Sequence, residues 1–136
     1  MGRVLGLDYG ERRVGVALSD QLRMIAQPHS VIDLTKDDLA AVLADIVVAE
    51  DIEEVVVGLP VSLSGDEGPS ARAARQFGDE VAQITGLSVN YQNEQFSSVV
   101  AERALLEGGL SRQDRRDMRD KVAAAVLLQD YLDTAS

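Results

Sequence analysis

The sequence predicts an α/β protein in which a mixed β-sheet carries helices on both faces. Two short apolar runs, residues 4–8 and 14–19, stand at the beginning of the chain and are separated by a short polar connection. Helix-like and strand-like patterns then alternate along the rest of the chain. Hydrophobic residues make up 46% of the 136 residues, which is enough to bury a core. We therefore expect a single domain over residues 1–136.

The two opening runs predict an antiparallel pair of strands, because the connection between them is too short for a crossover. Bulky and small residues alternate along the second strand: Val14, Gly15, Val16, Ala17, Leu18 and Ser19. A strand face made only of small residues lets a helix or a ligand approach closely. Residues 23–34 predict a third strand, with Pro28 near a bend or at an edge.

The first helix is expected to start at a capping box formed by Thr35 and Asp38 and to end near Glu50. Residues 54–58 then form a short continuous apolar run. Such a run is typical of a strand that is covered on both faces.

A second helix is predicted from Pro69 to about Thr85, because proline suits the first turn of a helix. Residues 87–94 follow as the fifth strand. Two more helices are expected, one ending near Leu106 and a last one capped by Ser111. The last helix is apolar on nearly every face along its middle, which predicts deep burial.

The composition excludes several kinds of site. The chain has no cysteine, so it has no disulfide framework, zinc–thiolate site or thiol nucleophile. It shows no secretion signal, and no apolar run approaches about 18 residues. We expect a soluble cytoplasmic protein that does not bind membranes.

The net charge is −10, which by itself argues against a polyanionic partner. The charge is unevenly distributed, however. Residues 33–54 hold eight acids against one lysine, and residues 103–121 hold six bases against four acids. Charge alone favours two solvated helix faces of opposite character, and a local anion-binding side is the alternative.

Three carboxylates stand at the ends of segments that should be buried. Asp8 ends the first strand, Glu94 follows the last strand, and Asp120 opens the apolar part of the last helix. The carboxyl ends of parallel strands form one rim, and a helix crossing the sheet could bring Asp120 there. Converging carboxylates repel one another unless a cation compensates their charge.

Oxygen ligands of this kind are those that Mg²⁺ or Mn²⁺ prefers. Two such ions about 3.5–4 Å apart can activate water and stabilise the leaving oxygen in phosphodiester cleavage. The hypothesis is that Asp8 is a metal ligand positioned by a rigid central strand. The plainer interpretations are a turn at Asp8, a loop acid at Glu94 and an ion pair of Asp120 with Arg116. The residues alone favour the plainer interpretations.

Five arginines near these acids are candidates for contacts with nucleic-acid phosphates: Arg12, Arg13, Arg112, Arg116 and Arg119. The last three share one helical face through their i+4 and i+7 spacing. The alternatives are solubilising turn residues and ion pairs within the helix.

Four stretches, in this order, resemble the motifs of the YqgF/RuvX family: "LGLDYGERRVGVALSD", "VVVGLPVSLSGDEGP", "NEQFSSVVAE" and "DKVAAAVLLQDYL". The resemblance covers nearly the whole chain. It implies an RNase H-like fold, with a mixed five-stranded sheet and helices on both faces. It also implies that Asp8, Glu94 and Asp120 are metal-binding catalytic acids of a nuclease that depends on Mg²⁺ or Mn²⁺.

The implied function is maturation of the 5′ end of precursor 16S ribosomal RNA. An earlier proposal for the family is resolution of Holliday junctions. The expected partner is therefore structured RNA or branched DNA, and the chain is expected to be a monomer or a homodimer. The Glu motif departs from the family pattern, because Asn93 and Gln95 replace its usual Asp and Arg. These departures and the acidic net charge keep a third alternative open, a non-catalytic nucleic-acid-binding domain.

Overall fold

The structure is a computed structural model that describes residues 2–62, 65–94 and 111–135. Five strands form one sheet: β1 (Arg3–Tyr9), β2 (Arg13–Ser19), β3 (Ala26–Asp33), β4 (Ile52–Leu59) and β5 (Ser88–Asn93). The strand order is β3-β2-β1-β4-β5. β2 is antiparallel to both β1 and β3, whereas β1, β4 and β5 run parallel. The sheet is therefore mixed, as the sequence predicts.

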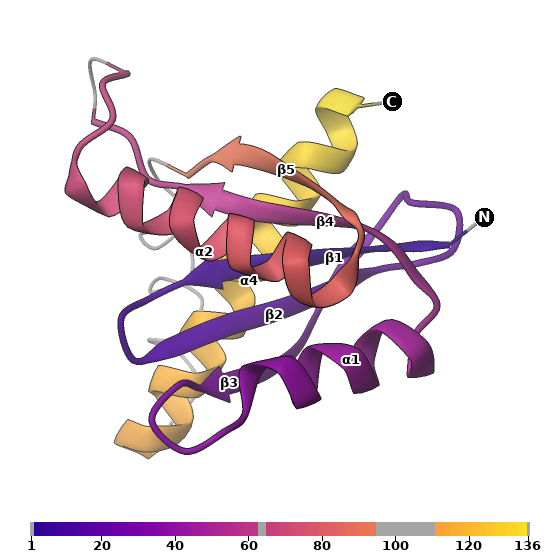
Figure 1. The fold of residues 1–136 in the computed structure, drawn as a ribbon, viewed down its shortest axis with the longest axis horizontal. Helices are drawn as coiled ribbons and strands as arrows, with labels where there is room; N and C mark the ends of the chain where they lie inside the picture. The colour runs from indigo at the N-terminus through magenta and orange to yellow at the C-terminus, as the bar shows by residue number, and fades with distance from the viewer. Residues whose placement is uncertain (1, 63–64, 95–110, 136) are drawn as a thin grey trace.

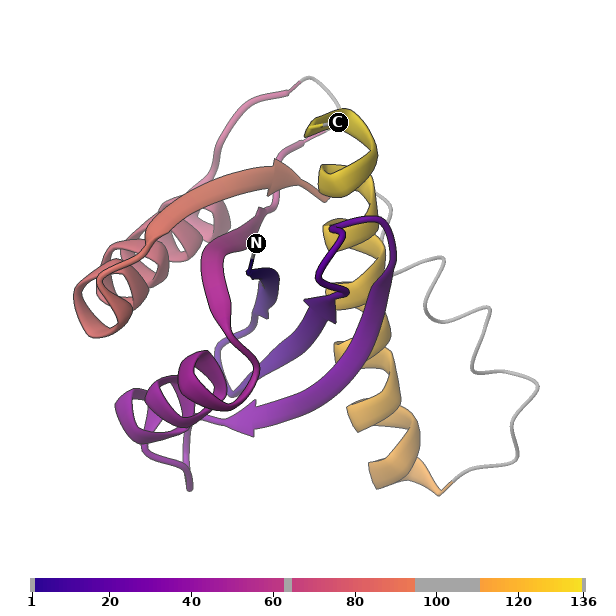
Figure 2. The same ribbon diagram turned by 90° about the vertical axis from the view of Figure 1, so that its right-hand side faces the viewer.

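Helices cover both faces of this sheet (Figures 1 and 2). α1 (Leu39–Ala49) and α2 (Pro69–Thr85) lie on one face, and α4 (Arg112–Ala135) crosses the opposite face. We call these the α1/α2 face and the α4 face. The expected arrangement of helices on both faces is confirmed.

Each face has its own hydrophobic core. On the α1/α2 face, the largest buried side chains of the core include Leu5, Leu7, Ile32, Leu43 and Phe77. On the α4 face, sheet and helix contribute Val4, Ala17, Val56, Ala124, Ala125, Leu127, Leu128 and Leu132. The central strands β1 and β4 thus contribute apolar side chains to both cores, which fixes them firmly between the helices.

The alternation along β2 decides which helix contacts which face. The bulky residues Val14, Val16 and Leu18 belong to the core of the α1/α2 face. The small residues point to the α4 face, where Ala17 packs in the second core. The prediction that the small face accepts a close neighbour is confirmed, and that neighbour is α4.

The start of the first helix differs from the prediction. The carboxylate of Asp38 caps α1 by accepting hydrogen bonds from the backbone N–H groups of Ala40 at 3.1 Å and Ala41 at 3.4 Å. Thr35 instead donates its hydroxyl to Asp33 at 2.6 Å. The capping box at Thr35 is therefore wrong, because a turn after β3 occupies that residue before the helix begins.

The remaining helix ends agree with the sequence pattern. Pro69 stands in the first turn of α2, and Gly86 ends that helix with a left-handed backbone at φ 70°. The hydroxyl of Ser111 accepts the backbone N–H of Asp114 at 3.1 Å, at the start of α4. The helix predicted to end at Leu106 lies outside the described residues.

The third strand is shorter than predicted, because β3 begins at Ala26 rather than at residue 23. Arg23 has a left-handed backbone at φ 57°, and its side chain bonds the carbonyl of Gly2 and the carboxylate of Glu54. Pro28 lies on β3, an edge strand, beside a shift in the β2–β3 register. The placement of Pro28 at an edge is confirmed.

None of the helices in the described parts of the chain combines the length and the apolar character needed to cross a bilayer.

Candidate active site

Asp8 lies near the end of β1, the strand at the centre of the sheet. Side chains alternate between the two faces of a strand. Leu7 and Tyr9 both contact the core of the α1/α2 face, so Asp8 points to the α4 face. Because β1 has a hydrogen-bonded neighbour on either side, the backbone at Asp8 is held in place.

A glycine on β2 brings the third acid to Asp8. Gly15 is the residue paired with Asp8 across the two strands. A Cβ atom on Gly15 would lie only 1.9 Å from the backbone oxygen of Asp120. The backbone of α4 therefore rests directly on β2, and this contact places Asp120 beside Asp8 although the two residues lie near opposite ends of the chain.

A second glycine, on β4, makes room for Glu94. Leu7 pairs with Val57, so Gly58 is the neighbour of Asp8 one step further along the parallel strands. A Cβ atom on Gly58 would lie 2.5 Å from Oε2 of Glu94. The side chain of Glu94 thus lies over the bare glycine backbone and forms a hydrogen bond with Asp8.

The electrostatics of Asp8 reflect these contacts. Burial raises the pKa of the Asp8 carboxyl, the hydrogen bond with Glu94 opposes this shift, and the negative charge of Asp120 adds to it. A hydrogen bond between two carboxyl groups requires a proton on one of them. A cation that binds both groups must therefore displace that proton.

The partner of Asp120 is Arg13, at the start of β2. The Nε atom of Arg13 donates to Oδ2 of Asp120 at 2.7 Å, and the two side chains are 22% and 21% exposed. The alternative from the sequence, an ion pair of Asp120 with Arg116, is therefore replaced by a contact between β2 and α4. The expectation that a bound dication compensates the acids leaves out this guanidinium, which the sequence pattern does not indicate as a partner of Asp120.

The structure thus brings the three predicted acids together in part. Asp8 and Glu94 are in hydrogen-bond contact, and Asp120 is close enough for its charge to act on Asp8. Within residues 2–62, 65–94 and 111–135, no three acidic or histidine side chains stand in an arrangement that could hold a metal ion. The donors are the hard oxygens that suit Mg²⁺ or Mn²⁺, but Asp120 is engaged by Arg13. Metal ligation by the three acids stays a prediction.

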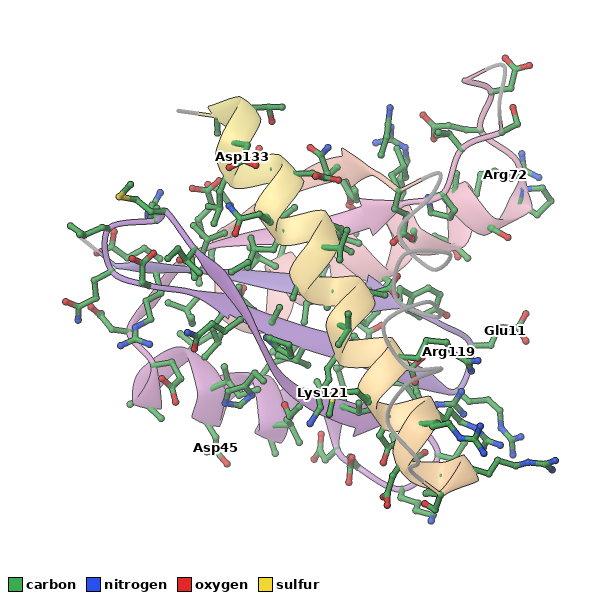
Figure 3. All side chains as sticks on the ribbon, turned by 180° about the vertical axis from the view of Figure 1, so that it is seen from behind. Glu11, Asp45, Arg72, Arg119, Lys121 and Asp133 are labelled. Carbon is green, nitrogen blue, oxygen red and sulfur yellow. The ribbon has the colours of Figure 1, made fainter. Side chains whose placement is uncertain are left out.

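The candidate phosphate-binding arginines lie at the same end of the molecule. Arg112, Arg116 and Arg119 all belong to α4, so their spacing does place them on one helical face. Figure 3 shows Arg119 in the first half of α4, on the same side of the molecule as Glu11 of the β1–β2 turn, with Asp133 near the other end of the helix. Arg12 is exposed in that turn. Their contact with nucleic acid stays a prediction.

The sequence marks Gly15 as part of a small strand face and Gly58 as the end of a strand at the same rim, but not as the residues that let Asp120 and Glu94 approach Asp8. A signal was present, because Gly15 interrupts a bulky strand and Gly58 ends a run of valines. Of the two residues that depart from the family pattern, Asn93 ends β5 and is exposed. Gln95 lies outside the described residues.

Residues 2–134 match the protein-family model described as "RuvX: Holliday junction resolvase". The chain belongs to the RuvX family.

Curated relatives cover almost the same span. A protein of Lactococcus lactis subsp. cremoris (strain MG1363) is 43% identical, with 96% of this chain and 94% of the relative aligned. A protein of Myxococcus xanthus (strain DK1622) is 44% identical, over 96% and 87%. Both carry the name "Putative pre-16S rRNA nuclease". The names of the RuvX family and of these relatives indicate a nuclease.

Solved structures share the fold of this RuvX-family chain at low sequence identity. Thermus thermophilus RuvC in complex with a Holliday junction substrate aligns with a TM-score of 0.57 and 15% identity, over 99% of this chain and 96% of that one. The yeast mitochondrial Holliday junction resolvase Ydc2 aligns with a TM-score of 0.51 and 11% identity, over 96% and 78%. These neighbours confirm the RNase H-like fold that the sequence resemblance implies.

Proposed function

We propose that this chain is a divalent-metal-dependent endonuclease that hydrolyses phosphodiester bonds in structured RNA. The substrate we propose is precursor 16S ribosomal RNA, cleaved during maturation of its 5′ end in the cytoplasm by a single nuclease domain. Membership of the RuvX family and the names of the curated relatives support this function. The observation that carries it is Asp8, on the central strand, in contact with Glu94 and beside Asp120.

Asp8, Glu94 and Asp120 are the residues that would hold Mg²⁺ or Mn²⁺. When bound, such an ion activates water and stabilises negative charge on the leaving oxygen. Asp8 has the central role in this proposal, because it lies between the other two acids on the middle strand of the sheet.

The rest of the chain would position these groups and the substrate. Gly15 and Gly58 allow α4 and Glu94 to approach Asp8, and the two cores hold the strands rigid. The arginines of the β1–β2 turn and of α4 would bind substrate phosphates on either side of the scissile bond: Arg12, Arg13, Arg112, Arg116 and Arg119. Such contacts orient the phosphodiester for attack.

Replacing Asp8 by asparagine tests the function. We expect Asp8→Asn to lower kcat on a precursor 16S RNA in Mg²⁺ or Mn²⁺ by at least about 100-fold, because an essential negative charge is lost. The matched control is Asp45→Asn, an exposed acid of α1 on the other side of the sheet (Figure 3), which should keep wild-type activity. Unchanged cleavage by Asp8→Asn would reject the proposed site.

A resolvase that cuts branched DNA is the second candidate function. The description of the matching family favours it, and the same acids would serve. Symmetric nicking of a four-way junction without cleavage of precursor RNA would support it. Because two strands must be cut, a resolvase is expected to act as a two-fold dimer, whereas the RNA nuclease can act as a monomer. Light scattering in solution distinguishes the two states.

A non-catalytic nucleic-acid-binding domain is the third candidate, and it would show no activity either in the RNA-cleavage assay or in the junction-nicking assay. It would bind RNA or DNA tightly and cleave neither in the presence of Mg²⁺ or Mn²⁺.

A further inference from the structure

We propose that Arg13 is a positioning residue that holds Asp120 away from the metal site until a substrate phosphate draws the guanidinium away. The inference rests on the proposed function, because it takes Asp8, Glu94 and Asp120 as the acids that bind the ion. Under this proposal Arg13 controls the position of Asp120, whereas the other arginines at this end of the molecule would only bind phosphate.

The ion pair itself is well defined. Nε of Arg13 lies 2.7 Å from Oδ2 of Asp120, a short distance for a charge-assisted hydrogen bond. Both side chains are about one-fifth exposed. A pair in such a partly buried position is less screened by solvent than an exposed surface pair. The Arg13 guanidinium therefore competes with other cations for the carboxylate of Asp120.

The backbones on both sides of the pair are fixed. Arg13 is paired with Asp33 in the β2–β3 register, and the backbone of Asp120 rests on Gly15. Asp120 can therefore join Asp8 only by a rotation of side chains, and that rotation requires Arg13 to release it. The required change is small and local, and it needs no movement of α4.

The position of Arg13 also suits it to a phosphate. It follows the exposed Arg12 at the end of the β1–β2 turn, and its guanidinium carries five N–H donors, of which the bond to Asp120 uses one. Arginine binds phosphate with the same planar geometry as it binds carboxylate. A phosphate of the substrate backbone is therefore a direct competitor of Asp120 for this side chain.

A thermodynamic consequence follows from this competition. The positive charge of Arg13 at Oδ2 lowers the attraction of Asp120 for a dication and holds the carboxylate in its present rotamer, so whatever removes the guanidinium strengthens metal binding. Because coupling between two ligands is reciprocal, a metal ion and a phosphate-bearing substrate should each increase the affinity of the protein for the other. The protein would thus complete its metal site only when substrate is present.

The test is the affinity of the intact chain for Mn²⁺, measured by calorimetry or by the electron paramagnetic resonance signal of free Mn²⁺. We expect Arg13→Met, which keeps the aliphatic stem, to bind Mn²⁺ about fivefold more tightly or better. The matched control Arg12→Met removes the same charge from the adjacent exposed residue and should change the affinity by less than about twofold. Equal gains in the two variants, or weaker binding by Arg13→Met, would overturn the proposal.

A second measurement probes the role of phosphate. Addition of a short DNA oligonucleotide should increase the Mn²⁺ affinity of the wild type, and it should leave that of Arg13→Met unchanged. Arg13→Lys keeps the charge without the Nε donor and should fall between the two. It serves as the working variant if Arg13→Met does not fold, as judged by circular dichroism. No effect of the oligonucleotide on the wild type would contradict the proposal.

Asp8→Asn separates this inference from the proposed function. Loss of Mn²⁺ binding in Asp8→Asn, with no gain in Arg13→Met, would reject the role of Arg13 and leave the metal site standing. Mn²⁺ binding that survives in Asp8→Asn would reject the proposed metal site, and the role of Arg13 with it.

Discussion

Single residues without side chains determine how closely the acids approach Asp8. Gly15 admits the backbone of Asp120 on one side, and Gly58 admits the carboxylate of Glu94 on the other. The two contacts differ in kind, because the first involves rigid backbone and the second involves the end of a flexible side chain. An added methyl group should therefore disturb the fold at Gly15 and chiefly the chemistry at Gly58.

Gly58→Ala tests this distinction. Its Cβ would lie 2.5 Å from Oε2 of Glu94, so the carboxylate must move away from Asp8. We expect kcat on precursor RNA to fall about 10- to 100-fold, since a displacement of about 1 Å has effects of this size. The free energy of unfolding in urea should fall by no more than about 1–3 kcal/mol.

The matched control is Gly68→Ala, because a Cβ at Gly68 would meet nothing within 4 Å. It should keep activity close to the wild type, and because Gly68 is the N-cap of α2, where alanine is a weaker cap, the free energy of unfolding should fall by no more than about 1 kcal/mol. Full activity in Gly58→Ala would show that the position of Glu94 over Gly58 does not matter for catalysis.

At this scale the sequence singled out three acids that the structure brings together in part, but it did not indicate how their charge is compensated. Asp8 and Glu94 could be singled out because each stands at the carboxyl end of an expected strand, and the carboxyl ends of parallel strands share a rim. The ion pair of Asp120 with Arg13 could not be recognised. It depends on where α4 crosses β2, and that is decided by the packing of the whole helix.

At the scale of helices and strands, the sequence pattern alone predicted the structure where the pattern repeats every two residues. The alternation of bulky and small residues along β2 correctly predicted its two faces, because side chains on a strand alternate strictly. The start of α1 was placed three residues too early. Thr35 and Asp38 are both good capping residues, and the turn that follows β3 decides between them.

Substitution of the two candidate caps tests the observed start of α1. Asp38→Ala removes the acceptor for two backbone N–H groups and should lower the free energy of unfolding by about 1 kcal/mol. Thr35→Ala loses only a hydrogen bond to Asp33 within the turn and should cost less. Urea unfolding of both variants gives the comparison. A larger loss in Thr35→Ala would show that the helix begins where the sequence suggested.

At the scale of the whole molecule, the uneven charge reconciles an acidic protein with a polyanionic substrate. The net charge is −10, yet the first turns of α4 carry several arginines, and α4 contacts the start of β2 through the ion pair of Asp120 with Arg13. Figure 3 shows this end of α4 opposite the end that carries Asp133. Repulsion from the acidic remainder would restrict nucleic acid to the arginine-bearing end, next to Asp8.

The salt dependence of binding tests this arrangement. Arg116→Gln should weaken the binding of RNA of any sequence, and it should reduce the slope of log affinity against log salt by about one, as expected for one lost phosphate contact. Arg72→Gln, an exposed arginine of α2 (Figure 3), is the matched control and should leave the slope unchanged. Equal slopes for Arg116→Gln and the wild type would exclude Arg116 from the phosphate contacts.

The mixed sheet and the two-sided helix cover were also accessible from the sequence at this scale. A hairpin followed by alternating helices and strands permits few arrangements of the sheet. The exact crossing point of α4 was not accessible, because the small face of β2 indicates a close neighbour but not which residue of α4 will lie on Gly15.

The measurement that bears most directly on this account is a crystal structure of the protein soaked with Mn²⁺, examined by anomalous scattering. We expect Mn²⁺ bound between the carboxylates of Asp8 and Glu94, with Asp120 released from Arg13 where substrate phosphate is also present. Crystals in which Asp8 remains hydrogen-bonded to Glu94, with Mn²⁺ absent or bound only elsewhere, would contradict it.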